Sequence, residues 1–269
     1  MLVTLTTDFG LRDGYVAAMK GAMLRVEPAL RLMDVSHMIA AQDVMEGAFV
    51  LRQVVPYTPP GTVHLAVVDP GVGSARQGIA ARFGDQFFVG PDNGLLALLL
   101  DGGAPDEAVV LDRPAFWRTS APSATFHGRD VFGPVAAHLA RGARLDALGA
   151  PAEPAERLLW PLPRADWQGI EGWVAHVDGY GNCITNIPRA LVERYRGGRR
   201  VKGFVGSTIV RDVHRTYSDV PAGEPVMLYG SGDVLEVSVN EGNAARLLSV
   251  RRGNPVTLVF EGPPPTSAS

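Results

Sequence analysis

Residues 63–73 read Val-His-Leu-Ala-Val-Val-Asp-Pro-Gly-Val-Gly. A run of six mostly apolar residues that stops at an Asp-Pro-Gly turn is typical of a strand buried inside a parallel sheet. Short apolar runs of the same kind lie at residues 2–6, 31–35 and 87–89. We therefore expect these four segments to be strands of one sheet.

Segments with helical periodicity separate these strands. Residues 15–26 and 43–54 place apolar side chains three and four positions apart, and a further helix is expected over residues 95–100. Strands that alternate with helices predict βαβ units and a mostly parallel sheet. The sequence thus predicts an α/β fold whose N-terminal domain, residues 1–162, is a Rossmann-like α/β sandwich.

The pattern changes beyond a proline-rich stretch at residues 151–163, which interrupts any regular element. Short β-like runs, separated by Gly, Asn and Asp, then follow one another. They lie at residues 173–177, 183–187, 201–210, 226–229, 235–239 and 256–260. Such a series predicts a small C-terminal antiparallel β-barrel domain, residues 163–262. Residues 263–269 are expected to be a disordered tail.

Composition excludes several classes of protein. The 269 residues are 46% apolar and include one cysteine, Cys183, which excludes a disulfide framework and a zinc site built on several thiolates. The formal net charge of −3 gives no basic surplus for nucleic acid or an anionic membrane. We recognise no targeting signal and no apolar stretch near the roughly 18 residues of a membrane span. We expect a cytoplasmic protein with no nucleic-acid or membrane partner.

Polar residues gather where the predicted strands end, and open α/β sheets bind their ligands at such places. Asp8 follows the first strand beside Gly10. Its carboxylate can accept both hydrogen bonds of a ribose diol, or it can cap the helix that follows. Asp69 and Arg76 flank the turn after the strand at 63–68. They can form a charge-assisted pair that serves chemistry or simply braces the loop.

Two further clusters offer groups for chemistry. His127 lies in a glycine-bearing loop and is a candidate general base or water-orienting group, although a lone histidine is more often structural. Residues 178–182 and 240–244 contain asparagines that suit the edge of a purine, or ordinary turn chemistry. No cluster has the spacing of a metal site. The residues alone predict a small-molecule α/β enzyme with a β domain, for which a nucleoside-like ligand is one option.

The motifs are more specific together than apart. In order, they lie at residues 6–10 (Thr-Thr-Asp-Phe-Gly), 67–73 (Val-Val-Asp-Pro-Gly-Val-Gly), 90–94 (Gly-Pro-Asp-Asn-Gly), 126–130 (Phe-His-Gly-Arg-Asp), 178–182 (Asp-Gly-Tyr-Gly-Asn) and 240–244 (Asn-Glu-Gly-Asn-Ala). The combination resembles the S-adenosyl-L-methionine hydroxide adenosyltransferase family, whose relatives are fluorinating and chlorinating enzymes. The resemblance extends over about residues 2–260.

This resemblance implies an N-terminal α/β domain, a C-terminal β-barrel and a homotrimer. In the family, the substrate lies between the N-terminal domain of one subunit and the C-terminal domain of the next. The implied reaction converts S-adenosyl-L-methionine and water into adenosine and L-methionine, with no cofactor and no metal.

The resemblance also implies roles for single residues. Asp69, Arg76 and His127 are expected to hold and activate the water. The other residues carried over are expected to bind the substrate: Asp8 the ribose hydroxyls; Asp13, Asp178 and Ser231 the methionine part; Asn182 and the backbone around Val239 and Glu241 the adenine.

Three departures separate this sequence from the halogenating relatives. Asp69 stands where those enzymes have a tyrosine, Val72 where they have a threonine, and Gly128 where they have a halide-binding serine. A carboxylate beside the reacting carbon also repels a halide. These differences argue against a halogenase, which remains one alternative. The other alternative is a sensor that binds adenosine or S-adenosyl-L-methionine without consuming it.

Overall fold

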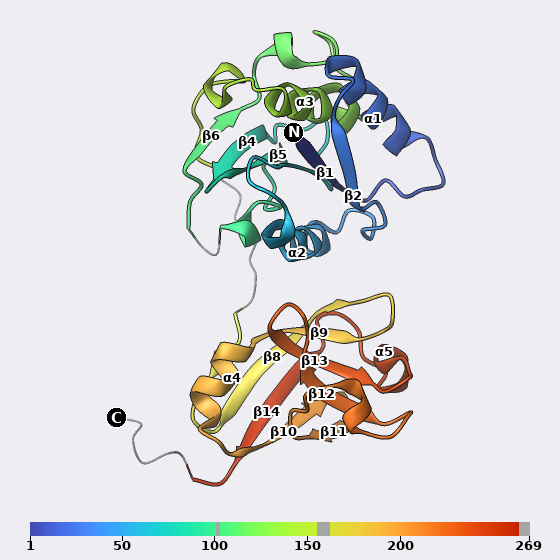
Figure 1. Ribbon diagram of the computed structural model, residues 1–269, viewed down its shortest axis with the longest axis vertical. Helices are drawn as coiled ribbons and strands as arrows, with labels where there is room; N and C mark the ends of the chain where they lie inside the picture. The colour runs from blue at the N-terminus through green and yellow to red at the C-terminus, as the bar shows by residue number, and fades with distance from the viewer. Residues whose placement is uncertain (101–102, 155–161, 264–269) are drawn as a thin grey trace. The chain divides into compact units, whose positions relative to one another are not determined.

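The computed structural model describes residues 1–100, 103–154 and 162–263. The chain forms two compact units, Met1–Trp160 and Pro161–Ser269 (Figure 1). The expected domain boundary between residues 162 and 163 stays a prediction. Residues 155–161, which precede it, and the expected disordered tail beyond Pro263 lie outside the described residues.

The first unit is built on a six-stranded sheet with the order β2-β1-β3-β5-β4-β6. Its strands are β1 (Leu2–Thr7), β2 (Arg31–Ser36), β3 (Val63–Val67), β4 (Gly78–Phe83), β5 (Gln86–Pro91) and β6 (Glu107–Val110). The strands β1, β2, β3 and β5 pair in parallel, whereas β4 runs antiparallel to both β5 and β6. The four expected strands are present. The sheet is mixed because β4, next to the edge strand β6, runs antiparallel to its neighbours.

Three helices cover this sheet: α1 (Tyr15–Val26), α2 (Val44–Val54) and α3 (Gly133–Ala140). Figure 1 shows α1 beside α3, with α2 on the opposite side of the sheet. The helix α1 buries Met19 and Met23, one turn apart, on its sheet-facing side. Asp43 caps the helix α2, because its carboxylate accepts the N–H of Glu46 at 3.0 Å.

The helix expected over residues 95–100 is wrong. Only a single 3₁₀ turn, Ala97–Leu99, forms there. Glycines lie on both sides, at Gly94 with a φ of +101° and at Gly103. The leucine-rich residues 95–100 are too few to repay the cost of nucleating an α-helix, and one tight turn buries Leu95, Leu96 and Leu98.

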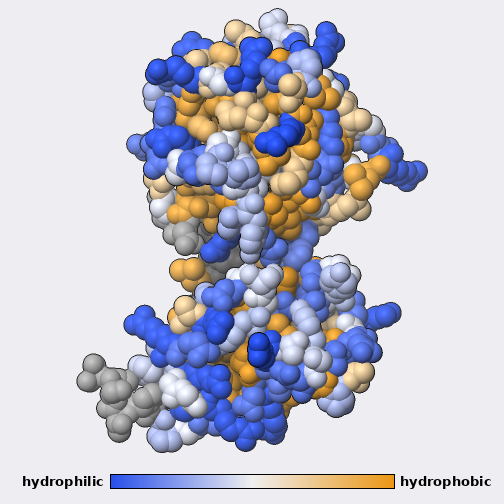
Figure 2. Space-filling model, viewed as in Figure 1, coloured by the Kyte–Doolittle hydropathy of each residue, from blue (hydrophilic) through white to orange (hydrophobic). Residues whose placement is uncertain are grey.

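The second unit is an antiparallel sheet curled into a nearly closed barrel. Its strand order is β11-β10-β14-β8-β9-β13-β12, with β7 beside β8. The strands are β7 (Arg164–Ala165), β8 (Gly169–Val177), β9 (Cys183–Pro188), β10 (Arg200–Val205), β11 (Thr208–Arg211), β12 (Pro225–Tyr229), β13 (Val234–Val239) and β14 (Pro255–Glu261). Hydrophilic residues cover most of this unit on the face shown in Figure 2, because its apolar strand faces point into one core.

Two details of this unit bear on the site. The short helices α4 (Arg189–Arg196) and α5 (Ala244–Leu247) interrupt the strand succession. The run at residues 201–210, expected as one strand, is instead the hairpin of β10 and β11. Gly206, with a φ of +58°, provides the left-handed conformation at the turn between them. The chain therefore combines a mixed α/β unit with an antiparallel, barrel-like unit.

Candidate functional site

Three side chains of the first unit meet in one hydrogen-bonded cluster. Nε of Arg76 donates to Oδ1 of Asp69 at 2.8 Å, and Nη2 donates to Oδ2 of the same carboxylate. This fork is the geometry in which a guanidinium matches a carboxylate best. The same Nη2 lies 2.9 Å from Nδ1 of His127. The three residues expected to handle water are thus in direct contact.

The arginine also fixes the proton on His127. A guanidinium donates and cannot accept, so Nδ1 of His127 is the acceptor and the neutral ring carries its hydrogen on Nε2. Burial, followed by the charge of Arg76, lowers the pKa of His127, while Asp69 and Asp130 oppose that shift. His127 therefore presents an Nε2–H donor at neutral pH.

Glycines allow the surrounding loops to approach one another. Gly73 has a φ of +77°, and a Cβ there would lie 2.4 Å from the carbonyl oxygen of Ala124. A side chain at residue 73 would push the Arg76 loop away from the segment that carries His127. At Gly128, a Cβ would lie 2.9 Å from Cζ of Phe9. A serine at that position would collide with this ring.

A buried carboxylate holds the His127 segment, and sequence reasoning missed it. Asp130 is fully buried. Its oxygens accept from Nε of Arg118 at 2.5 Å, from Nε of Arg129 at 2.6 Å and from the N–H of Ser123 at 2.9 Å. The bonds from Arg129 contribute most to holding the pKa of Asp130 far below its usual range. The adjacent Arg129 and Asp130 in the motif at residues 126–130 were the sequence signal that could have identified this carboxylate.

Asp8 lies at the same edge of the sheet. It follows β1, the parallel neighbour of β3, so Asp8 and Asp69 come after adjacent strand ends. Oδ2 of Asp8 accepts the backbone N–H of Gln42 at 2.8 Å. The helix α1 begins after Gly14 with no side-chain cap, so the alternative in which Asp8 caps this helix is wrong. Asp13 is exposed in the turn before α1.

Three aromatic rings link the Asp8 turn to the His127 segment. Phe9 and Phe126 meet edge to face at 5.6 Å between ring centroids, and Tyr15 meets Phe126 at 5.4 Å. Tyr15 remains 52% exposed, so this cluster presents an aromatic surface beside the polar groups. Sequence reasoning missed the cluster, although Phe9 and Phe126 adjoin two residues that it singled out.

In the second unit, Asp178 and Asn182 belong to one tight turn between β8 and β9. Oδ1 of Asp178 accepts the N–H groups of Tyr180 and Asn182, both at 2.9 Å. Its Oδ2 accepts from Nδ2 of Asn182 at 3.0 Å. These bonds are the turn chemistry that the sequence left open. They engage the side-chain nitrogen of Asn182, a residue that is only 9% exposed.

The segment after β13 packs against this turn. A Cβ on Gly181 would lie 2.1 Å from Cγ of Asn243, and the N–H of Ala245 donates to the oxygen of Gly181 at 2.9 Å. Val239 ends β13, and the exposed Glu241 has a φ of +55° in the turn that follows. The two parts of the asparagine-rich cluster, far apart in sequence, are therefore neighbours.

Ser231 is not brought together with these residues. It is exposed in the turn between β12 and β13, at the beginning of β13, whereas Val239 ends that strand. A six-residue strand extends roughly 17 Å at about 3.3 Å per residue. The hairpin thus separates Ser231 from the Asp178 turn by most of the length of a strand.

The described residues provide little else that could bind a metal or react as a thiol. Across residues 1–100, 103–154 and 162–263, no three His, Cys, Asp or Glu side chains gather as a metal ion requires. Burial raises the pKa of the Cys183 thiol to about 11, so it is a poor nucleophile. Among the helices in those ranges, none reaches the length and apolarity of a bilayer-spanning segment.

Comparisons with known proteins match nearly the whole chain. Residues 3–149 match the model of the SAM hydroxide adenosyltransferase N-terminal domain, and residues 172–257 match that of the C-terminal domain. A protein of Thermus thermophilus named (R)-S-adenosyl-L-methionine hydrolase is 44% identical over 96% of this chain and 99% of its own length. One of the same name from Salinispora arenicola is also 44% identical, over 94% of this chain and 95% of its own.

A more distant relative and a solved structure also match nearly the whole chain. A fluorinase of Actinoplanes sp. is 26% identical over 96% of this chain and 97% of its own length. The crystal structure of an uncharacterized conserved protein from Thermotoga maritima covers 96% of this chain and all of its own, with a TM-score of 0.90 and 34% identity. This chain belongs to the SAM hydroxide adenosyltransferase family.

Proposed function

We propose that this protein hydrolyses S-adenosyl-L-methionine to adenosine and L-methionine. Family membership and the name shared by the 44% identical relatives support this reaction. The observation that carries the proposal is the contact of Asp69, Arg76 and His127 at the carboxyl edge of the sheet. It joins an anion, a cation and a neutral donor in one hydrogen-bonded cluster.

The chemistry needs a well-placed water. The sulfonium makes methionine a neutral leaving group, so the oxygen of water attacks C5′ in line with the C–S bond. That bond breaks with its electron pair going to sulfur, and the water loses a proton. Holding the water in place converts a bimolecular step into a unimolecular one.

The geometry divides these tasks among the three residues. Each oxygen of Asp69 retains a lone pair beyond the bond from Arg76, and this carboxylate is the anion that accepts the proton. His127 donates Nε2–H to the water and orients it. Arg76 holds both partners in position, and its guanidinium stacks at 5.0 Å from the centre of the buried Phe132 ring.

The residues proposed for substrate binding are assigned to three parts of the substrate. Asp8 takes the ribose hydroxyls, with the aromatic cluster of Phe9, Tyr15 and Phe126 beside it. Asn182 and the backbone at Val239 and Glu241 take the adenine. The remaining residues, Asp13, Asp178 and Ser231, are proposed for the methionine part. Ser231 lies at the end of β13 opposite to Val239.

We further propose a Rossmann-like class for the first unit, a cytoplasmic location and a homotrimer in which two subunits share each site. Proposed ligand-binding residues occur in both units of the chain, which supports shared sites. Sedimentation equilibrium tests the trimer: three times the mass of the chain is expected, and a monomer at micromolar concentration contradicts it.

Product analysis separates this function from its two rivals. Purified protein is incubated with S-adenosyl-L-methionine and equal amounts of adenosine and methionine are expected by chromatography and mass spectrometry. Parallel reactions contain chloride or fluoride, and a 5′-halo nucleoside there identifies a halogenase. Calorimetric binding without any product identifies a sensor. Either of the last two results overturns the proposal.

A further inference from the structure

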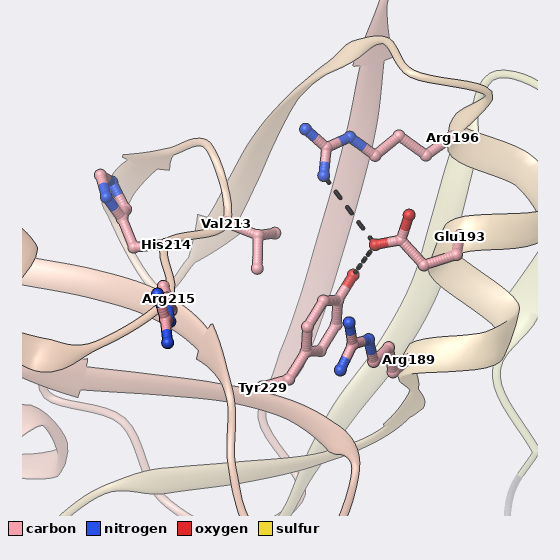
Figure 3. Close-up of a pocket in the computed structure, with 7 residues that line it drawn as sticks. All are labelled: Arg189, Glu193, Arg196, Val213, His214, Arg215 and Tyr229. Carbon is pink, nitrogen blue, oxygen red and sulfur yellow. Dashed lines mark hydrogen bonds and ion pairs between the residues drawn. The ribbon is translucent and has the colours of Figure 1, made fainter.

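A cavity of about 300 Å³ lies in the second unit, between α4 and the segment that joins β11 to β12. Figure 3 shows Glu193 and Arg196 leaving α4 toward the ring of Tyr229, with Arg189 beside that ring and Arg215 across from the helix. None of the residues proposed for S-adenosyl-L-methionine lines this cavity. It is therefore open to a different ligand.

The charges around the cavity are mostly positive. The guanidinium groups of Arg189, Arg196 and Arg215 line it together with one carboxylate, Glu193. That carboxylate is already engaged, because the hydroxyl of Tyr229 donates to it at 3.0 Å and Arg196 lies 4.0 Å away. Burial and then the bond to Glu193 raise the pKa of Tyr229, so its phenol stays a donor. A surplus of guanidinium donors remains.

Neighbouring carboxylates do not use up this surplus. Asp219 accepts the backbone N–H groups of Arg215 and Thr216 at 2.9 and 3.1 Å. Those backbone bonds are the main cause of the lowered pKa of Asp219, and the charges of His214 and Arg215 add to it, although no ion pair joins Asp219 to the Arg215 guanidinium among the described residues. Arg189 is 3.7 Å from Asp233, but these side chains are 56% and 70% exposed, and such surface pairs are weak.

We propose that this cavity binds a phosphorylated small molecule, whose doubly charged phosphate is held between Arg189 and Arg215. The two guanidinium groups come from different elements, and each offers paired donors, which suits a dianion better than a monoanion. Val213 and the ring of Tyr229, over which Arg189 lies at 5.1 Å, also line the cavity. These two side chains suit a flat, apolar remainder of the ligand.

Isothermal titration calorimetry of the full chain at constant ionic strength tests this site with phenyl phosphate, inorganic phosphate and benzenesulfonate. One site per chain is expected, with phenyl phosphate bound most tightly and benzenesulfonate, a monoanion with the same ring, at least about tenfold more weakly. Arg189→Gln and Arg215→Gln should each raise the Kd for phenyl phosphate about tenfold.

Arg194→Gln is the matched control. This residue leaves the same helix but lies over the ring of Tyr195 at 5.4 Å and does not line the cavity. Its variant should bind phenyl phosphate as the unmodified protein does. Equal weakening in all three variants, unchanged affinity in Arg189→Gln and Arg215→Gln, equally tight benzenesulfonate, or no saturable binding at millimolar concentration overturns the proposal. Thermal unfolding verifies that each variant is folded.

Discussion

At the scale of single residues, His127 is the most constrained group of the proposed site. Its Nδ1 faces Nη2 of Arg76 at 2.9 Å, which leaves the Nε2–H as the group that can reach a ligand. Burial and the charge of Arg76 lower its pKa, so the ring stays neutral. This arrangement assigns His127 the orientation of water and leaves the proton to Asp69.

We predict that His127→Ala lowers kcat by about 10²-fold, the usual contribution of a group that acts on the water. His127→Gln should recover at least about tenfold of that loss, because its amide carries both an acceptor for Arg76 and a donor for water. Steady-state kinetics with equally folded variants measure both. A glutamine variant as slow as the alanine variant would show that His127 acts as a base instead.

Asp69→Asn should also lower kcat by about 10²-fold, because the amide keeps the shape of the side chain but loses the anion that accepts the proton. Asp146→Asn is the control. Asp146 has the same forked pairing, with Arg144 at 3.0 and 2.6 Å, but these side chains are 53% and 83% exposed on the surface. Near-normal turnover in Asp69→Asn would remove this residue from the chemistry.

At the scale of elements, the loop after β3 decides whether the cluster forms. Gly73→Ala should lower kcat/KM at least tenfold and destabilise the protein by about 1–3 kcal/mol, because the new Cβ meets Ala124 in a left-handed conformation. Gly84→Ala separates the two effects. Gly84 has a φ of +58° but no atom within 4 Å of a Cβ, so its variant should lose stability and keep its activity. Equal activity losses would contradict this account.

The strand β3 also carries a pH-sensitive group, His64. It is fully buried, with Thr4 at 2.8 Å from Nδ1, and burial lowers its pKa to about 4 from the ordinary 6.5. A depressed histidine pKa stabilises the fold above pH 6.5, and this stability is lost as the pH falls toward 4. The loss should reach about 3 kcal/mol.

Urea unfolding at pH 7 and pH 4 measures this loss. His64→Gln, which cannot titrate, should show a smaller difference between the two pH values than the unmodified protein. Titration of the His64 ring by nuclear magnetic resonance gives an independent value. A ring that titrates near 6.5 in the folded protein would refute the prediction.

Periodicity explains which elements could be predicted from the sequence. The helix α1 was recognisable because its apolar residues repeat with a helical period, and the strand β3 because it is a short apolar run that stops at a turn. The helix α3 gave no such signal, because seven of its eight residues are buried and it is apolar on nearly every side. The strand β4 mixes glycine, alanine and Arg82, so nothing marked it as part of the sheet.

The candidate site also has a part that could be predicted from the sequence and a part that could not. The residues Asp69, Arg76 and His127 were found from their motifs, but their contacts depend on the packing of loops 51 residues apart. The bonds that hold Asp130 and the rings around Phe126 arise only from that packing. The position of Ser231 at the far end of β13 follows from the register of the hairpin, which its own sequence does not specify.

At the scale of the whole molecule, the chain combines two units with separate cores. The first unit carries the proposed water-handling cluster and Asp8. The second carries the Asp178 turn and, away from it, the basic cavity beside α4. The residues proposed for the bond-breaking step therefore lie in the first unit alone, whereas those proposed for ligand contacts lie in both units.

Hydrolysis in oxygen-18 water tests whether water itself attacks C5′ of S-adenosyl-L-methionine. Direct displacement by water at C5′ places one labelled oxygen in the 5′-hydroxyl of adenosine and none in methionine, as mass spectrometry of the two products can show. Every adenosine formed is expected to carry that label, and Asp69→Asn is expected to form the same labelled adenosine about 10²-fold more slowly. Adenosine without label at the 5′ position, or no adenosine from the pure protein, would contradict it.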